Sequence, residues 1–130
     1  MKCLDTDLLV AILRGESYAQ AIMSELDSEV RNATTTINAF EIFYGASHSS
    51  KRVDNVQKVR TLLQRLDVLP FTLQASESAA DVLADLAAGG EIIDYRDAMI
   101  AGIVLESGLT LVTRNKRHFS RIPKLKLEGW

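Results

Sequence analysis

The sequence has little of what marks several specialised protein classes. It contains one cysteine, Cys3, in 130 residues, which excludes an internal disulfide and a zinc site built from several cysteines. Its two histidines are far apart in the chain, and no apolar run approaches the ~20 residues that cross a bilayer. Asp5 and Asp7 interrupt the first residues too early for a signal peptide. We therefore expect a cytoplasmic protein with no membrane partner.

Charge is nearly balanced overall but unevenly distributed. The net charge is −2, with 47% hydrophobic and 25% charged residues, which fits one globular domain over residues 1–130. It also argues against a generic basic coat for nucleic acid. Near the C-terminus, however, basic residues follow one another without an acid: Arg114, Lys116, Arg117, Arg121, Lys124 and Lys126. Such a run is as often a solvated face as a phosphate-binding surface.

Predicted strands and helices alternate along the chain. Short apolar or β-branched stretches predict strands at 1–4, 32–36, 68–71, 109–112 and 124–128. Helical periodicity predicts helices at 8–13, 17–28, 37–46, 51–66 and 73–88, and one more from Asp94 to a stop at Gly108. Pro70 favours an edge position for its strand, and the final strand also has edge character. This order predicts an α/β fold, a three-layer domain with a mostly parallel central sheet flanked by helices.

Polar side chains occupy positions that such a fold brings to one rim. Asp5 follows the first strand, Asn115 follows the strand at 109–112, and Asp97 lies in the first turn of the helix after Asp94. Glu41 is the lone charge in the apolar helix at 37–46. The carboxyl ends of parallel strands meet at the edge where ligands bind. The four side chains are therefore candidates for one site.

Each acid also has a simpler interpretation as a helix cap. Thr6 or Asp7 can cap the helix at 8–13, Asn38 and Glu41 have capping-box spacing, and Asp97 stands three residues after the good N-cap Asp94. We favour Asp5 as the functional residue, with Asp7 as a cap or an outer support.

Two further features surround Glu41. Gly45 lies one turn beyond it on the same helix face. Glycine inside a helix is unfavourable by about 1 kcal/mol relative to alanine, so we expect a bare surface that leaves room for a metal or a phosphate. The aromatic residues between positions 40 and 44 favour a core or subunit interface over a platform for stacking bases.

Clustered carboxylates predict a bound cation. They repel one another unless protons or cations compensate, and all-oxygen ligands select hard ions such as Mg²⁺ or Mn²⁺. These ions activate water and stabilise the charge that develops during phosphodiester cleavage. Arg114, Lys116 and Arg117 would then hold neighbouring phosphates.

An ordered set of motifs now resembles a known family. Asp5-Thr6 follows an apolar strand, Thr36 precedes Glu41 and Gly45, Asp97 opens DAMIA, and LVTRN containing Thr113 and Asn115 precedes His118-Phe119. In order and spacing, from Met1 to Trp130, the chain resembles the PIN-domain nucleases. The greatest likeness is to the VapC toxins of bacterial and archaeal toxin–antitoxin modules.

The resemblance implies an activity, a cofactor and partners. Asp5, Glu41 and Asp97 would be the metal-binding acids, and Asn115 would take a fourth catalytic position where many relatives have aspartate. Thr6 and Thr113 would be supporting hydroxyls, and Asp94 a cap close enough to assist. The implied enzyme is a Mg²⁺- or Mn²⁺-dependent endoribonuclease that leaves 5′-phosphate and 3′-hydroxyl ends.

The family also implies a homodimer and a cognate VapB-like antitoxin that blocks the groove with an extended segment. We expect an apolar surface to receive that segment, formed by Leu8, Leu9, Ile12, Ile42 and Phe43. If these side chains are internal in the free subunit, the expectation fails.

Two other interpretations stay open at this stage. Asp5-Thr6-Asp7 also suggests a haloacid-dehalogenase-like phosphatase, but no Gly-Asp pair or well-placed lysine accompanies it. The second is a catalytically weak RNA- or partner-binding module, which the neutral Asn115 suggests and three intact acids oppose. A dinucleotide-binding protein is disfavoured because no glycine-rich phosphate loop follows a strand.

Overall fold

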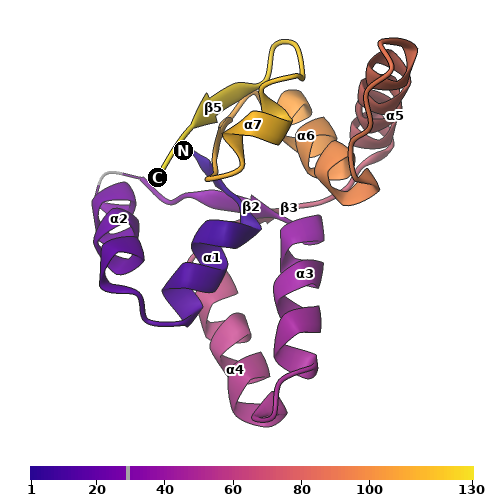
Figure 1. Cartoon of the computed structure of the whole chain (residues 1–130). Coiled ribbons are helices and arrows are strands. Elements are labelled where there is room, and N and C mark those ends of the chain that lie inside the picture. Colours follow the sequence, from indigo (N-terminus) through magenta and orange to yellow (C-terminus); the bar gives the residue numbers. More distant parts are fainter. Residues whose placement is uncertain (29) are drawn as a thin grey trace.

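A five-stranded parallel sheet forms the centre of the computed structural model, which describes residues 1–28 and 30–130 (Figure 1). The strands are β1 (Cys3–Leu4), β2 (Ala33–Thr35), β3 (Asp67–Leu69), β4 (Thr110–Val112) and β5 (Lys126–Glu128). Their order is β3-β2-β1-β4-β5, and all four pairings are parallel. The predicted α/β fold with a parallel sheet is confirmed, as are the edge positions of β3 and β5.

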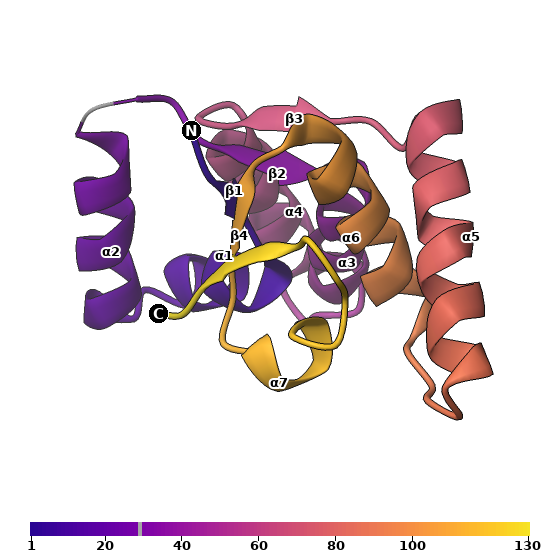
Figure 2. The same ribbon diagram turned by 90° about the horizontal axis from the view of Figure 1, so that it is seen from above.

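Helices cover both faces of this sheet. On one side lie α1 (Thr6–Leu13), α2 (Ser17–Asp27), α3 (Thr36–Ser47) and α4 (Arg52–Leu63). On the other lie α5 (Leu73–Ala88), α6 (Tyr95–Ser107) and α7 (Lys116–Phe119) (Figures 1 and 2). The first half of the chain thus builds one outer layer and the second half the other, as the three-layer prediction requires.

The short central strands explain how two cores form. Successive strand side chains point to opposite faces. In β1, Cys3 packs in the α5–α6 layer and Leu4 in the α1–α4 layer, and Leu111 and Val112 of β4 divide in the same way. All four are buried. Because both faces of β1 and β4 are covered, these strands read as continuous apolar runs.

Gly102 fixes the position of α6, the helix that carries Asp97. A Cβ at this position would overlap the Ala75 carbonyl oxygen and lie 3.0 Å from the Cβ of Ala79. Helices α5 and α6 therefore approach closely along small residues. Gly108 ends α6 in the left-handed conformation, at φ 69°, as its sequence position predicted.

Two of the alternative interpretations as helix caps are wrong, and both corrections concern the candidate site. Helix α3 begins at Thr36 because Thr35 caps it in a reciprocal capping box with Asn38, so Glu41 serves no cap. Helix α1 begins at Thr6, and its N-cap is Asp5 rather than Thr6 or Asp7. The predicted caps Thr72 and Asp94 are confirmed.

Among the described residues, no helix is both long and apolar enough to cross a bilayer.

Candidate functional site

Asp5 stands at the carboxyl end of the central strand and is 6% exposed. Its Oδ1 accepts hydrogen bonds from the Thr6 backbone N–H at 2.8 Å and from Asn38 Nδ2 at 3.0 Å. Its Oδ2 accepts one from the Thr113 hydroxyl at 2.7 Å. Donors from α1, α3 and the end of β4 therefore hold this carboxylate in one orientation.

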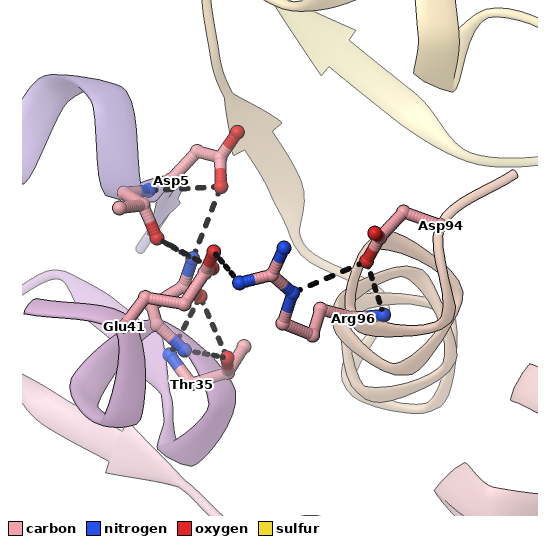
Figure 3. Close-up of polar contacts among 7 residues, drawn as sticks. Asp5, Thr35, Glu41, Asp94 and Arg96 are labelled. Atoms are coloured by element: carbon pink, nitrogen blue, oxygen red, sulfur yellow. Dashed lines mark hydrogen bonds and ion pairs between the residues drawn. The ribbon is translucent and has the colours of Figure 1, made fainter. Parts of the chain in front are cut away.

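Glu41 is tied to Asp5 through Thr6 and Asn38. Asn38 Nδ2 donates to the Thr6 hydroxyl at 2.8 Å, and that hydroxyl donates to Glu41 Oε1 at 2.9 Å (Figure 3). Asn38 also donates to Asp5, so one buried amide links two of the predicted acids. This role of Asn38 was not predicted, although a polar residue in a nearly uncharged apolar helix was a signal for it.

Asp97 completes the group from the first turn of α6. It is half-buried, and burial raises its pKa, with added repulsion from Asp94 and Glu41. Burial likewise raises the pKa of Asp5 from 3.8 to about 6, and the charges of Asp7 and Asp97 add to this rise. Asp97 thus interacts electrostatically with both other acids, as members of one site do.

Asp94 is more exposed and has a different surrounding. Its side chain accepts hydrogen bonds from the Arg96 backbone N–H at 2.8 Å and from Arg96 Nε at 3.2 Å. These bonds to Arg96 lower the pKa of Asp94. Asp94 therefore caps α6 at the rim of the site and repels Asp97.

Asp7 supports the site through hydrogen bonds to neighbouring chain segments. It accepts hydrogen bonds from the Arg114 backbone N–H at 2.9 Å and from Trp130 Nε1 at 2.8 Å. The buried Thr113 hydroxyl lies 3.1 Å from the same carboxylate and accepts from the Asn115 backbone N–H at 2.9 Å. Asp7 thereby fastens the β4–α7 turn and the C-terminus. Asn115 is half-buried at the start of α7.

Only one of the three predicted phosphate-binding residues lines the cavity that contains Asp97, and the other two lie against the C-terminal residues. Arg114 stacks on Trp130, 3.5 Å from the ring centroid, and Lys116 packs against Gly129. Arg117 alone lines the cavity of about 420 Å³ that also contains Asp94 and Asp97. The other residues lining that cavity are Ile92, Ile93, His118 and Arg121. His118 and Arg121 were absent from the predicted site.

A second cavity lies beside Glu41, between α1, α3 and α4. Its volume is about 330 Å³, and it is lined by Val10, Leu13, Arg14, Glu41, Ile42, Gly45, Ala46, Ser49, Asn55, Lys58 and Val59. A Cβ at Gly45 would meet nothing within 4 Å. The glycine therefore leaves open space beside the carboxylate, as predicted, and is not required by packing within the chain.

The prediction of an exposed apolar surface that receives the antitoxin segment is wrong. Leu8, Leu9, Ile12 and Ile42 are buried in the core under α1 to α4, and Phe43 is partly buried against the same core. Of the five, only Ile42 lines the cavity beside Glu41. Helical spacing identified an apolar face, but it did not show whether that face packs against the sheet or is exposed to solvent.

Comparison with known proteins identifies the family. A family model described as the PIN domain matches residues 2–125. The chain belongs to the PIN-domain family. This PIN domain is 31% identical over 130 residues to Ribonuclease VapC2 of Rickettsia felis, covering 98% of this chain and 96% of the relative. It is 36% identical over 100 residues to the tRNA(fMet)-specific endonuclease VapC of Salmonella typhimurium, covering 77% and 76% of the two chains.

Solved structures place the PIN domain in the same group. It superposes with a TM-score of 0.92 and 29% identity on a chain of VapBC2 from Rickettsia felis bound to a promoter DNA fragment, covering 99% of this chain and 98% of that one. With DNA-bound VapBC from Salmonella typhimurium, the TM-score is 0.90, the identity 31%, and the coverage 100% and 99%. The chain is therefore a VapC-type PIN domain, and the resemblance noted from its motifs is confirmed.

The donor chemistry of the site suits a hard divalent cation. Asp5, Glu41 and Asp97 supply carboxylate oxygens, which Mg²⁺ and Mn²⁺ prefer. The pKa values of Asp5 and Asp97 are raised mainly by burial, and the neighbouring acids add repulsion that a cation would relieve. Among the described residues, no three metal-ligating side chains converge as a preformed cluster. Near Glu41, the Arg96 guanidinium supplies positive charge instead, with Nη1 at 3.7 Å from Oε2.

Proposed function

We propose that this protein is the toxin of a toxin–antitoxin module and cleaves RNA as a Mg²⁺- or Mn²⁺-dependent endoribonuclease, leaving 5′-phosphate and 3′-hydroxyl ends. The observation that carries the proposal is the coupling of three acids at one edge of the sheet in a VapC-type PIN domain. Asp5 is linked to Glu41 through Asn38 and Thr6, and its charge acts on Asp97. A structural ion-pair network would supply a basic partner for each acid.

In this proposal, Asp5, Glu41 and Asp97 hold the metal, and Asn115 adds a neutral polar group at the fourth position. When bound, a divalent ion supplies the charge that lowers the pKa of water and stabilises negative charge on a phosphodiester. Thr6, Asn38 and Thr113 donate hydrogen bonds that fix the positions of the Asp5 and Glu41 carboxylates. Arg117 and Arg121, which line the same cavity as Asp97, hold the neighbouring RNA phosphates.

Two partners follow from the family. Its neighbours of solved structure include VapBC complexes, and we propose a VapB-like antitoxin that seats an apolar segment in the cavity beside Gly45 and Glu41. We also propose a homodimer, with its interface on the outer face of α3. There Phe40 and Tyr44 are 56% and 58% exposed, and their rings stack at 6.0 Å.

The test uses purified protein freed of antitoxin, total RNA, and Mg²⁺ or Mn²⁺. Sequencing the 5′ ends of the fragments identifies cut sites and end chemistry together. Initiator transfer RNA is the first defined substrate to assay, since one relative is named for cleaving tRNA(fMet). Asp5→Asn is the inactive variant, and Asp81→Asn, on the exposed face of α5, is the matched control.

We expect discrete cuts with 5′-phosphates, lost with Asp5→Asn or EDTA and kept with Asp81→Asn. Cuts that survive EDTA or leave 5′-hydroxyl ends contradict the metal mechanism. If the protein binds RNA but does not cleave it with any metal, the RNA-binding module becomes the favoured alternative. The neutral Asn115 is the residue that suggests it. The phosphatase alternative has no support from the family match.

A further inference from the structure

Arg96 holds a position in the site that no predicted role explains. It lies in the first turn of α6, one residue before Asp97, and 54% of its side chain is exposed. Its Nη1 lies 3.7 Å from Glu41 Oε2, and its Nε lies 3.2 Å from Asp94 Oδ1. Figure 3 shows the side chain reaching from α6 toward Glu41, with the guanidinium between the two carboxylates. Arg96 therefore spans the space between α6 and α3.

The contacts of Arg96 are electrostatic rather than structural. The charges of Asp94, Glu41 and Asp97 all act on its guanidinium, and its exposure leaves it outside both hydrophobic cores. Within residues 1–28 and 30–130, it provides the one ion pair recorded for Glu41. Since Glu41 Oε1 already accepts from Thr6, the guanidinium faces the oxygen that is left for a cation.

We propose that Arg96 is an internal counter-ion: it neutralises Glu41 while the site is free of metal and withdraws when a divalent cation binds. This inference rests on the proposed function, because it requires a metal at Asp5, Glu41 and Asp97. A half-exposed pair at this distance is weak, so a divalent ion bound by several carboxylates replaces it. Asp94 keeps its backbone contact to α6 throughout and gives the withdrawn guanidinium a nearby partner.

Competition between Arg96 and the metal predicts the direction in which metal affinity changes when Arg96 is removed. Removing the guanidinium leaves the acids more repulsive in the metal-free protein, so the cation relieves more repulsion on binding. We expect Arg96→Gln to bind Mn²⁺ about two- to fivefold more tightly than the unsubstituted protein, the range that a weak exposed ion pair supplies. Arg96→Lys keeps a cation on a shorter reach and should fall between the two.

The experiment is calorimetric titration of MnCl₂ into the full chain, purified free of antitoxin. Arg60→Gln is the matched control, since Arg60 is exposed on α4 and its loss changes net charge equally. A second readout is urea unfolding: in EDTA, Arg96→Gln should be less stable than the Arg60→Gln control, and saturating Mn²⁺ should remove that difference. A purely structural role for Arg96 would leave the difference in place.

Two failures are distinguishable. If the unsubstituted protein binds Mn²⁺ and Arg96→Gln binds it equally or more weakly, the counter-ion inference is wrong and the metal centre stands. If none of the four proteins binds Mn²⁺, the proposed metal centre is wrong, and the inference falls with it.

Discussion

Replacing Asp5 with asparagine should stabilise the metal-free protein while abolishing its activity. Burial and neighbouring acids raise the pKa of Asp5 from 3.8 to about 6. Above about pH 6, the ionised Asp5 carboxylate therefore destabilises the folded state relative to the unfolded chain. At 1.36 kcal/mol per pKa unit, this shift corresponds to about 3 kcal/mol. The amide has nearly the same shape and carries no charge, so its introduction should recover up to about that amount.

The hydrogen bonds around Asp5 tolerate the change. The amide oxygen can keep the Thr6 N–H and Asn38 Nδ2 donors that now reach Oδ1. The new N–H₂ group can donate to the Thr113 hydroxyl, which then turns its own hydrogen to Asp7 Oδ2 at 3.1 Å. The Asn115 backbone N–H still donates to that hydroxyl. The second N–H of the new amide has no acceptor among these groups, so it offsets part of the electrostatic gain.

The gain should depend on pH with a fixed sign. Because the folded pKa is raised, the folded state binds a proton that the unfolded chain releases between about pH 4 and pH 6, and the stability of the unsubstituted protein falls over this window as pH rises. Urea unfolding in EDTA should therefore show Asp5→Asn more stable above about pH 6, with the difference vanishing near pH 4. Lower stability of Asp5→Asn at neutral pH, or a difference independent of pH, would refute this reasoning.

Four other substitutions, at three positions, test separate parts of the account. Gly102→Ala should lower the free energy of unfolding by at least about 2 kcal/mol, because the new methyl overlaps the α5 backbone; little change in the urea midpoint would contradict that packing. The new methyl of Gly45→Ala meets open space, so this variant should raise the free energy of unfolding by up to about 1 kcal/mol. Gly45→Leu should instead fill the cavity and weaken antitoxin binding in a pull-down. Unchanged binding would exclude this cavity as the antitoxin-binding site. Arg117→Gln should weaken binding to uncleaved RNA and reduce the salt slope by about 0.7, measured by fluorescence anisotropy with Arg60→Gln as the control; an unaltered slope would remove Arg117 from the phosphate path.

Elements with a local cause were predictable from the sequence. The pairs Cys3–Leu4 and Leu111–Val112 are apolar and buried because both sheet faces are covered, and these short apolar runs are recognisable in the sequence. Thr72 and Asp94 cap their helices through bonds to residues two or three positions ahead. Gly108 ends α6 because it tolerates a positive φ.

Side-chain roles that depend on tertiary contacts were harder to predict. Asp5 is both an N-cap and a partner of Thr113, a residue 108 positions away, so capping and site membership were not exclusive. Asn38 was assigned to a capping box one turn too late, which concealed its bond to Asp5. Arg96 was overlooked because its contact with Glu41 depends on where α6 crosses α3.

The direction in which a side chain points was also beyond the sequence. Arg114, Lys116 and Arg117 are close neighbours in sequence, yet one stacks on Trp130, one packs on Gly129, and one lines the cavity that contains Asp97. The apolar stripe of α1 was recognised, but its burial against the core was not. Charge and hydropathy patterns mark candidate faces, whereas packing of distant elements selects among them.

The most direct test of the account is anomalous diffraction from crystals of the antitoxin-free protein soaked in Mn²⁺. The account predicts a manganese peak about 2.1 Å from oxygens of Asp5 and Asp97, a usual distance for such ions, with Glu41 turned to it and Arg96 withdrawn. Crystals of Asp5→Asn should lack that peak. A manganese site elsewhere, or an unchanged Arg96–Glu41 pair beside an occupied metal position, would contradict the account.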